Sequence, residues 1–360
     1  MQNFFTEMGN LTYKRAKLSN IFGEYIVFRE LNPVKKELPD FEKIKAALSL
    51  KKLPRKKDKE YAEALSYIFS SIRKFEKVFY IGDTLMSDLS VIKNFARIPG
   101  FKVFGVITRE GEMNGFELKE NFLMNGRWAN LREAITLCEE KIFRIDDKTV
   151  LIIDIDKTAI GGRGRNDKAI DKARIDAIRE LASEIFGKVE EERFSDAYRT
   201  ANRREFFYIT EDNQDIISIL SFLLYDGTVS VSEIEGGKFN TVIELLEKSH
   251  SKNEKLTHYV MKVLENIKSG NPTAFPSFRK KEFQKTIARS DFLPDETPIS
   301  TLLSEEIMIT GEVFDVAEDL KKRGTLVFGV SDKPALSTMP IDGEELPPVY
   351  EKTMKVYSEV

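Results

Sequence analysis

Four short apolar runs, each four or five residues long, constrain the fold of this chain more than any other feature. They are rich in β-branched and aromatic residues, are bounded by polar residues, and span 78–81, 103–107, 150–153 and 326–330. Runs of this length and composition are typical of strands buried in a parallel sheet. A weaker fifth run spans 307–309, and 22–29 is also compatible with a strand.

Segments with helical periodicity lie between these runs. Residues 59–74 place apolar side chains on one helical face, and 87–97 and 311–323 show the same pattern. Strands that alternate with helices predict an α/β fold with a doubly wound, mostly parallel, Rossmann-like sheet.

Residues 161–305 have a different pattern, with long amphipathic segments and hardly any strand signal. We therefore expect a helical domain at 161–305, inserted into an α/β core made of 1–160 and 306–360. A chain of 360 residues is long enough for two units with cores that need no cross-links.

The composition narrows the class of protein. The chain is 41% hydrophobic and 32% charged, as soluble globular proteins are, and its net charge is −3. This near-balance gives no overall basic field, so we expect neither nucleic acid nor a membrane as a partner. The first residues lack a signal-peptide pattern, no run of 18 apolar residues occurs, and the lone Cys138 fits a reducing compartment. These features predict a cytoplasmic protein.

Cysteine and histidine chemistry is nearly excluded by the residue counts. The two histidines, His250 and His258, lie in a polar helical stretch with no acid at a recognisable spacing. A Ser-His-Asp hydrolase or a zinc site needs more than this. Chemistry must therefore rest on carboxylates, lysines and hydroxyls.

Acidic side chains follow two of the predicted strands. Asp154 and Asp156 come directly after the third run, and their i, i+2 spacing points both into one crevice. Asp83 and Asp88 come after the first run, behind a glycine. For any single pair of acids, a helix cap or a turn is the commoner role.

Hydroxyls and a lysine follow the other strands. Thr310 comes after the weak fifth run, and Ser331 and Lys333 come after 326–330. Ligands of open α/β sheets bind beyond the carboxyl ends of the strands, so all these groups are expected along one rim. Such an oxygen-rich rim suits Mg²⁺ together with a phosphate group.

This combination resembles the haloacid dehalogenase (HAD) superfamily of phosphohydrolases. Its first motif, an apolar strand ending in Asp-x-Asp-x-Thr, is matched by Asp154, Asp156 and Thr158. The glycine common after the second acid is Lys157 here. Its second motif, a strand ending in Thr or Ser, is matched by Thr310.

The family's fourth motif, Gly-Asp-x-x-x-Asp, is resembled by Gly82, Asp83 and Asp88 with one extra residue in the spacing. In the family this motif follows the first, but here it precedes it. The order is intact when read cyclically, so the resemblance implies a circularly permuted core. The alternative is a homodimer in which two incomplete modules complete each other.

The third motif is a lysine that neutralises phosphoryl oxygens, usually about one helix upstream of the Gly-Asp strand. This position points to Lys57 or its neighbours Lys56 and Lys59. Lys333, directly after a core strand, is an equally good candidate.

The resemblance implies a mechanism. Asp154 attacks phosphorus and forms an aspartyl-phosphate, and Asp156 protonates the leaving oxygen and then activates water. Mg²⁺ is held by Asp154, Asp83 and the backbone carbonyl of Asp156, with Asp88 acting through water. Thr310 and a lysine bind the remaining phosphoryl oxygens.

The helical insertion begins directly after the first motif, where the family places a cap over the site. The implied substrate is a small phosphorylated metabolite. The candidates to read its anionic groups are Arg163, Arg165, Arg203 and Arg204, although solvated charge is the commoner role. Two alternatives use the same residues: a phosphotransferase or phosphomutase, and a non-catalytic module that only binds Mg²⁺.

Overall fold

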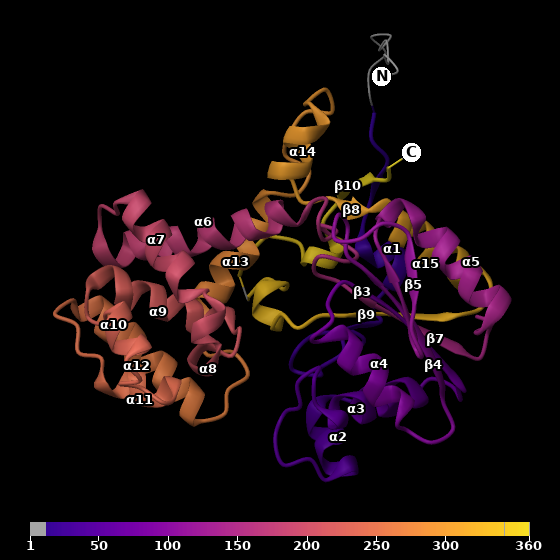
Figure 1. Cartoon of the computed structure of the whole chain (residues 1–360), viewed down its shortest axis with the longest axis horizontal. Helices are drawn as coiled ribbons and strands as arrows, with labels where there is room; N and C mark the ends of the chain where they lie inside the picture. The colour runs from indigo at the N-terminus through magenta and orange to yellow at the C-terminus, as the bar shows by residue number, and fades with distance from the viewer. Residues whose placement is uncertain (1–11, 342, 360) are drawn as a thin grey trace. The chain divides into compact units, whose positions relative to one another are not determined.

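The computed structural model describes residues 12–341 and 343–359, and its chain divides into two compact units (Figure 1). The sheet unit takes in Met1–Lys172, Thr286–Lys333 and Glu345–Val360. The helical unit takes in Ala173–Lys285 and Pro334–Glu344.

The sheet unit is built on a seven-stranded sheet with the order β2-β9-β7-β3-β4-β6-β5. The strands are β2 (Ile26–Val27), β3 (Lys77–Gly82), β4 (Lys102–Thr108), β5 (Phe116–Leu118), β6 (Phe122–Asn125), β7 (Thr149–Asp154) and β9 (Leu326–Val330). All neighbours are parallel except β5 and β6. The four apolar runs form the consecutive strands β9, β7, β3 and β4, so the predicted mostly parallel α/β sheet is confirmed.

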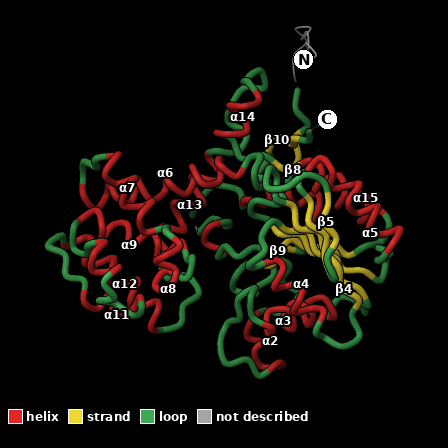
Figure 2. Tube along the Cα trace, viewed as in Figure 1, coloured by secondary structure: helices red, strands yellow, loops and turns green. Residues whose placement is uncertain are grey.

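Helices cover both faces of this sheet (Figure 2). One face carries α2 (Phe41–Leu48), α3 (Lys59–Ser70) and α4 (Asp88–Ala96), and the other carries α1 (Leu18–Phe22), α5 (Leu131–Lys141) and α15 (Gly311–Lys322). Because side chains alternate along a strand, Tyr80 packs in the core beneath α3, whereas Phe79 contacts Phe143 on the opposite face. The predicted helices 59–74, 87–97 and 311–323 correspond to α3, α4 and α15.

A second, three-stranded sheet lies in the same unit, with β1 (Arg15–Ala16) and β8 (Ile309–Thr310) on either side of β10 (Met354–Tyr357). The run at 307–309 was expected in the main sheet, but β8 pairs with β10 instead. The place beside β9 is occupied by β2, and an apolar run alone does not say which sheet it joins. The short α14 (Ile299–Glu305) precedes β8.

The helical unit has its own core, built around the buried aromatic residues Phe194, Phe222 and Phe275. Its helices are α6 (Asp167–Phe186), α7 (Glu191–Ala201), α8 (Phe207–Thr210), α9 (Gln214–Asp226), α10 (Val231–Glu235), α11 (Val242–Lys248), α12 (Glu254–Lys268) and α13 (Pro276–Ala288), of which α6 and α13 also run into the sheet unit. Single 3₁₀ turns occur at Trp128–Asn130, Arg204–Phe206, Ala335–Ser337 and Val349–Glu351.

This unit is shorter than the predicted insertion at 161–305. Residues on both sides of it belong to the sheet unit, where the Asn166 side chain donates to the backbone carbonyls of Leu303 and Glu306. The late segment Pro334–Glu344 joins the helical unit, where Ser337 donates to Glu282 at 2.8 Å.

Candidate functional site

Strand register brings the predicted site residues to one rim of the main sheet. Ile81 on β3 pairs with Ile153 on β7, and Asp154 on β7 pairs with Val330 on β9. The three strands therefore end at the same level, and the residues that follow them share one edge. This is the edge at which open α/β sheets bind ligands.

A buried cluster of three carboxylates lies at this rim. Asp83, Asp88 and Asp154 each place one carboxylate oxygen within 4.8 Å of the others. They come from two segments about 70 residues apart, which the pairing of β3 with β7 brings together. An all-oxygen donor set of this kind is the set that Mg²⁺ and Ca²⁺ prefer.

Lys56 is the cation of this cluster. It is buried, its ammonium group donates to the Asp154 carboxylate, and its Nζ lies 3.1 Å from Asp88 Oδ1. The expected residue Lys57 has an exposed side chain, so the structure places its neighbour at the acids. Nothing in the run of lysines from 51 to 59 marks Lys56 as the buried one.

Asp88 holds the loop that follows β3. Its Oδ2 accepts from the backbone amides of Asp83 and Thr84 at 3.1 and 2.9 Å, and its Oδ1 accepts from the Tyr80 hydroxyl at 2.7 Å. The loop closes tightly, because a Cβ on Gly82 would lie 2.7 Å from the Asp88 carboxyl group. The extra residue between the two acids is thus compatible with their meeting. The contributions of Tyr80 and Thr84 were not foreseen from the sequence.

Asp156 lies outside the carboxylate cluster and has partners of its own. The Ser331 hydroxyl donates to its Oδ2 at 2.6 Å, and Lys333 Nζ lies 2.8 Å from its Oδ1. Lys56 and Lys333 therefore each contact a different acid of the first motif. A fifth acid of this rim, Asp332, is exposed and lies 3.8 Å from Lys56.

Thr310 is not brought to the carboxylates by any hydrogen bond in the described part of the chain. Its backbone amide donates to the carbonyl of Ala159 at 2.9 Å, and its buried Oγ1 has no hydrogen-bond partner within 12–341 and 343–359. A Cβ on Gly162 would lie 3.0 Å from that hydroxyl, so Thr310 packs against the loop that follows the first motif. Ser331, at the end of a strand next to β7, is the hydroxyl that contacts an acid of the motif.

Arg163 is a second cation at the cluster. Its guanidinium donates to the Asp83 carboxylate, and Thr158 Oγ1 lies 3.5 Å from the same group. The neighbouring Arg165 faces elsewhere, because it is held by Glu110 and Glu312.

The pKa values of the cluster show that it is short of positive charge. Burial and the nearby Asp88 raise the pKa of Asp83 to about 7, although Arg163 opposes the shift. Burial also raises the pKa of Asp154 well above its usual range, with partial compensation by Lys56. Burial acts on Asp88 as well, but Lys56 and the hydrogen bonds from Tyr80 and Thr84 lower its pKa. A bound cation would relieve this shortage.

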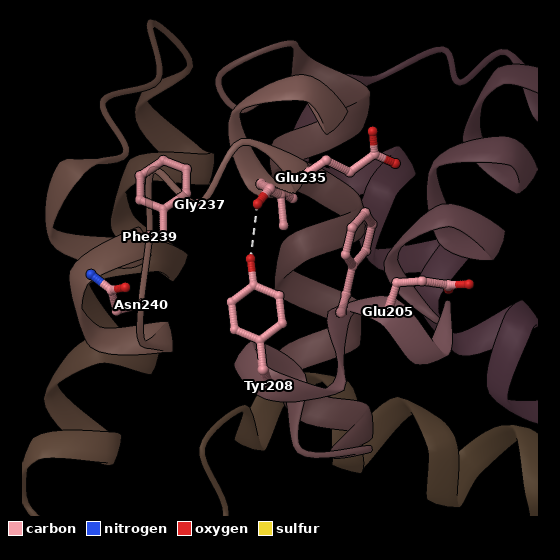
Figure 3. Close-up of a pocket in the computed structure, with 8 residues that line it drawn as sticks. Glu205, Tyr208, Glu235, Gly237, Phe239 and Asn240 are labelled. Atoms are coloured by element: carbon pink, nitrogen blue, oxygen red, sulfur yellow. Dashed lines mark hydrogen bonds between the residues drawn. The ribbon is translucent and has the colours of Figure 1, made fainter.

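The helical unit contains a separate pocket of about 350 Å³ (Figure 3). Aromatic side chains and two carboxylates line it, and the Tyr208 hydroxyl donates to the carbonyl of Ile234 at 2.9 Å. It shares no residue with the carboxylate cluster. The candidate metal site is therefore the carboxylate cluster at the rim of the sheet and not this pocket.

Taken together, the fold and the rim define an α/β protein with a buried carboxylate and lysine site at the carboxyl edge of a mostly parallel sheet. No protein-family model, curated protein or solved structure matches the chain. Among the described residues, no helix has both the length and the apolar character needed to cross a bilayer.

Proposed function

We propose that this protein is a Mg²⁺-dependent phosphohydrolase that acts on a small phosphorylated metabolite through an aspartyl-phosphate on Asp154. Within this proposal it is a HAD-like enzyme whose core strands occur in permuted order. The observation that carries the proposal is the meeting of Asp154 with Asp83, Asp88 and Lys56 at one sheet edge.

The donor set fits a hard divalent cation. Asp83 and Asp154 would bind it directly, together with the backbone carbonyl of Asp156, and Asp88 would act through water because its oxygens already accept several hydrogen bonds. Mg²⁺ in this place would polarise the phosphoryl group and offset its charge.

Asp154 is the nucleophile of the proposed reaction. Lys56 holds its Oδ1 and supplies positive charge next to the entering phosphoryl oxygens. The carboxylate attacks phosphorus as the bond to the leaving oxygen breaks, so one difficult displacement becomes two easier ones.

Asp156 is the acid and base of the proposed reaction. The Ser331 and Lys333 contacts fix its carboxyl group beside the cluster without making it part of the cluster. From there it gives a proton to the leaving oxygen and later takes one from the water that hydrolyses the aspartyl-phosphate. A site that only stored Mg²⁺ would have less need of this second acid.

The strand arrangement supports the permuted order. The Gly-Asp strand β3 and the first-motif strand β7 are neighbours in one sheet of one chain, so no second subunit is needed to bring their acids together.

Hydrolysis of an aryl phosphate tests the proposal. We expect activity that requires Mg²⁺ and a loss of about 10³-fold or more in kcat for Asp154→Asn, because the nucleophile is removed. Asp319→Asn, at an exposed surface ion pair, is the matched control and should retain activity. Equal activity of wild type and Asp154→Asn would reject Asp154 as the nucleophile.

A further inference from the structure

Arg163 lies where a metal ion and a phosphate group would both need to be accommodated. Its guanidinium contacts Asp83, and an oxygen of Asp83 lies within 4.8 Å of one of Asp154. The Arg163 side chain is 28% exposed, whereas Lys56 is buried. Arg163 is therefore the cation of the cluster that has room to move.

The backbone of Arg163 is held at both its amide and its carbonyl, whereas its partly exposed side chain is held by the contact with Asp83. Its amide donates to the carbonyl of Lys157 at 2.8 Å, and its carbonyl accepts from Trp128 Nε1 at 3.0 Å. Gly161 and Gly164, on either side, adopt φ values of +60° and +81° that suit glycine. Such a loop fixes the position of Cα and leaves the side-chain torsions to decide where the guanidinium lies.

A divalent cation on Asp83 would compete with Arg163. Two positive groups bound to one carboxylate repel each other, and the ion gains more from a site with several oxygen donors than a guanidinium does. The displaced guanidinium would remain tethered a few ångströms from Asp154. Its planar fork matches two oxygens of a phosphate group.

We propose that Arg163 occupies the Asp83 carboxylate in the metal-free protein, is displaced by the divalent cation, and then binds the substrate phosphate. The second half of this proposal rests on the proposed function, whereas the competition with metal rests on the carboxylate site alone. The arrangement couples metal binding to phosphate binding through one side chain.

Calorimetric titrations test both halves. Mg²⁺ is titrated into metal-free protein, and inorganic phosphate is titrated into Mg²⁺-saturated protein. For Arg163→Gln we expect Mg²⁺ to bind about tenfold more tightly, because a competitor is gone, and phosphate to bind about tenfold more weakly. These effects have opposite signs, whereas a merely structural role would weaken both affinities or change neither.

Two further variants complete the experiment. Arg163→Lys keeps the charge, so it should bind Mg²⁺ nearly as wild type does and recover part of the phosphate affinity. Arg323→Gln is the matched control, because it removes an arginine paired with Glu139 just before β9, at the opposite edge of the sheet, and it should change neither affinity.

The outcomes separate the two proposals. Unchanged Mg²⁺ affinity in Arg163→Gln overturns the competition, and unchanged phosphate affinity overturns the role in phosphate binding. If Arg163→Gln binds Mg²⁺ more tightly as expected but the wild type hydrolyses no aryl phosphate, the proposed function fails, whereas the competition between Arg163 and the metal stands. If the wild type binds no Mg²⁺, both proposals fail.

Discussion

Lys56 and Lys57 are consecutive residues with opposite environments. Lys56 is buried against Asp154 and Asp88, and Lys57 is exposed. Upstream position and residue type locate a lysine within a few residues. The choice among neighbours depends on the turn before α3, which the sequence pattern does not encode.

Replacing each of these lysines by methionine gives a matched pair of variants. Lys56→Met should lower aryl phosphate hydrolysis by about 10²-fold or more, because it removes the charge that faces the proposed nucleophile and leaves buried acids unpaired. Lys57→Met should retain wild-type activity. The ratio of the two kcat/KM values is the measurement, and equal losses would show that Lys56 has no special role.

The raised pKa of Asp83 predicts that Mg²⁺ binding at the proposed site depends on pH. In the folded, metal-free protein its pKa is about 7, above the unfolded value of 3.8, so the folded state holds the extra proton between these values. The free energy of unfolding of the metal-free protein should therefore fall as pH rises through this window. Mg²⁺ binding displaces the proton, so its affinity should rise over the same range.

We expect the Mg²⁺ affinity to fall about tenfold for each pH unit below about 7, and to level off above it. The raised pKa of Asp154 acts in the same direction. Titration calorimetry in a series of buffers measures the effect, and an affinity independent of pH between about 5.5 and 8 would contradict it.

Lys157 shows how a departure from a sequence pattern is accommodated. It takes the place of a glycine common in the resembled motif and adopts φ of +63°, a conformation that glycine favours. Its amino group binds Asp171 at 2.8 Å. The backbone at this position therefore has a conformation that glycine favours, although the residue is a lysine.

At the scale of the elements, the sequence predicts the strands of the sheet centre better than it predicts their surroundings. The central strands are continuous apolar runs, and burial on both faces gives them a strong signal. By contrast, β2 has only two residues, and β8 pairs with β10 in the second sheet and not with a strand of the main sheet. Strand pairing between distant segments decides both cases, and no local pattern encodes it.

The hydroxyls of Ser331 and Thr310 test which strand end supplies a hydroxyl to the proposed site. Ser331→Ala should lower kcat/KM by about tenfold, because the hydrogen bond that orients Asp156 is lost. Thr310→Val should retain activity and stability, since the Thr310 hydroxyl has no hydrogen-bond partner among the described residues. The reverse ranking would restore Thr310 as the hydroxyl of the site.

At the scale of the whole molecule, the boundary between the two units falls inside helices at two places. Both α6 and α13 cross it, at Lys172 and Lys285, with no change of periodicity there. The sequence predicts a helical unit at 161–305, and the helical unit of the structure takes in Ala173–Lys285 and Pro334–Glu344. The sequence does not show that the ends of the insertion pack in the sheet unit.

Two separate cores predict two unfolding transitions. Trp128 is the single tryptophan and lies in the sheet unit, so its fluorescence reports that unit, whereas far-ultraviolet circular dichroism reports both. Mg²⁺ at about 100 times its Kd should stabilise the fluorescence transition by about 2.7 kcal/mol. Mg²⁺ should not change the midpoint of the unfolding transition of the helical unit. Coincident transitions that shift together would show one cooperative unit.

Two neighbouring strands of the main sheet, β2 and β9, are synthesised at very different times. Ile26 on β2 pairs with Gly329 on β9, so roughly 300 residues must be synthesised between them. At about 5–20 residues per second, β2 waits on the ribosome for about 15 to 60 s before its neighbour emerges. During that interval the nascent chain contains the β2 segment without its partner strand, while the helical unit is still being synthesised. Because β2 is synthesised long before β9, we expect chaperones to bind the nascent segment that contains β2.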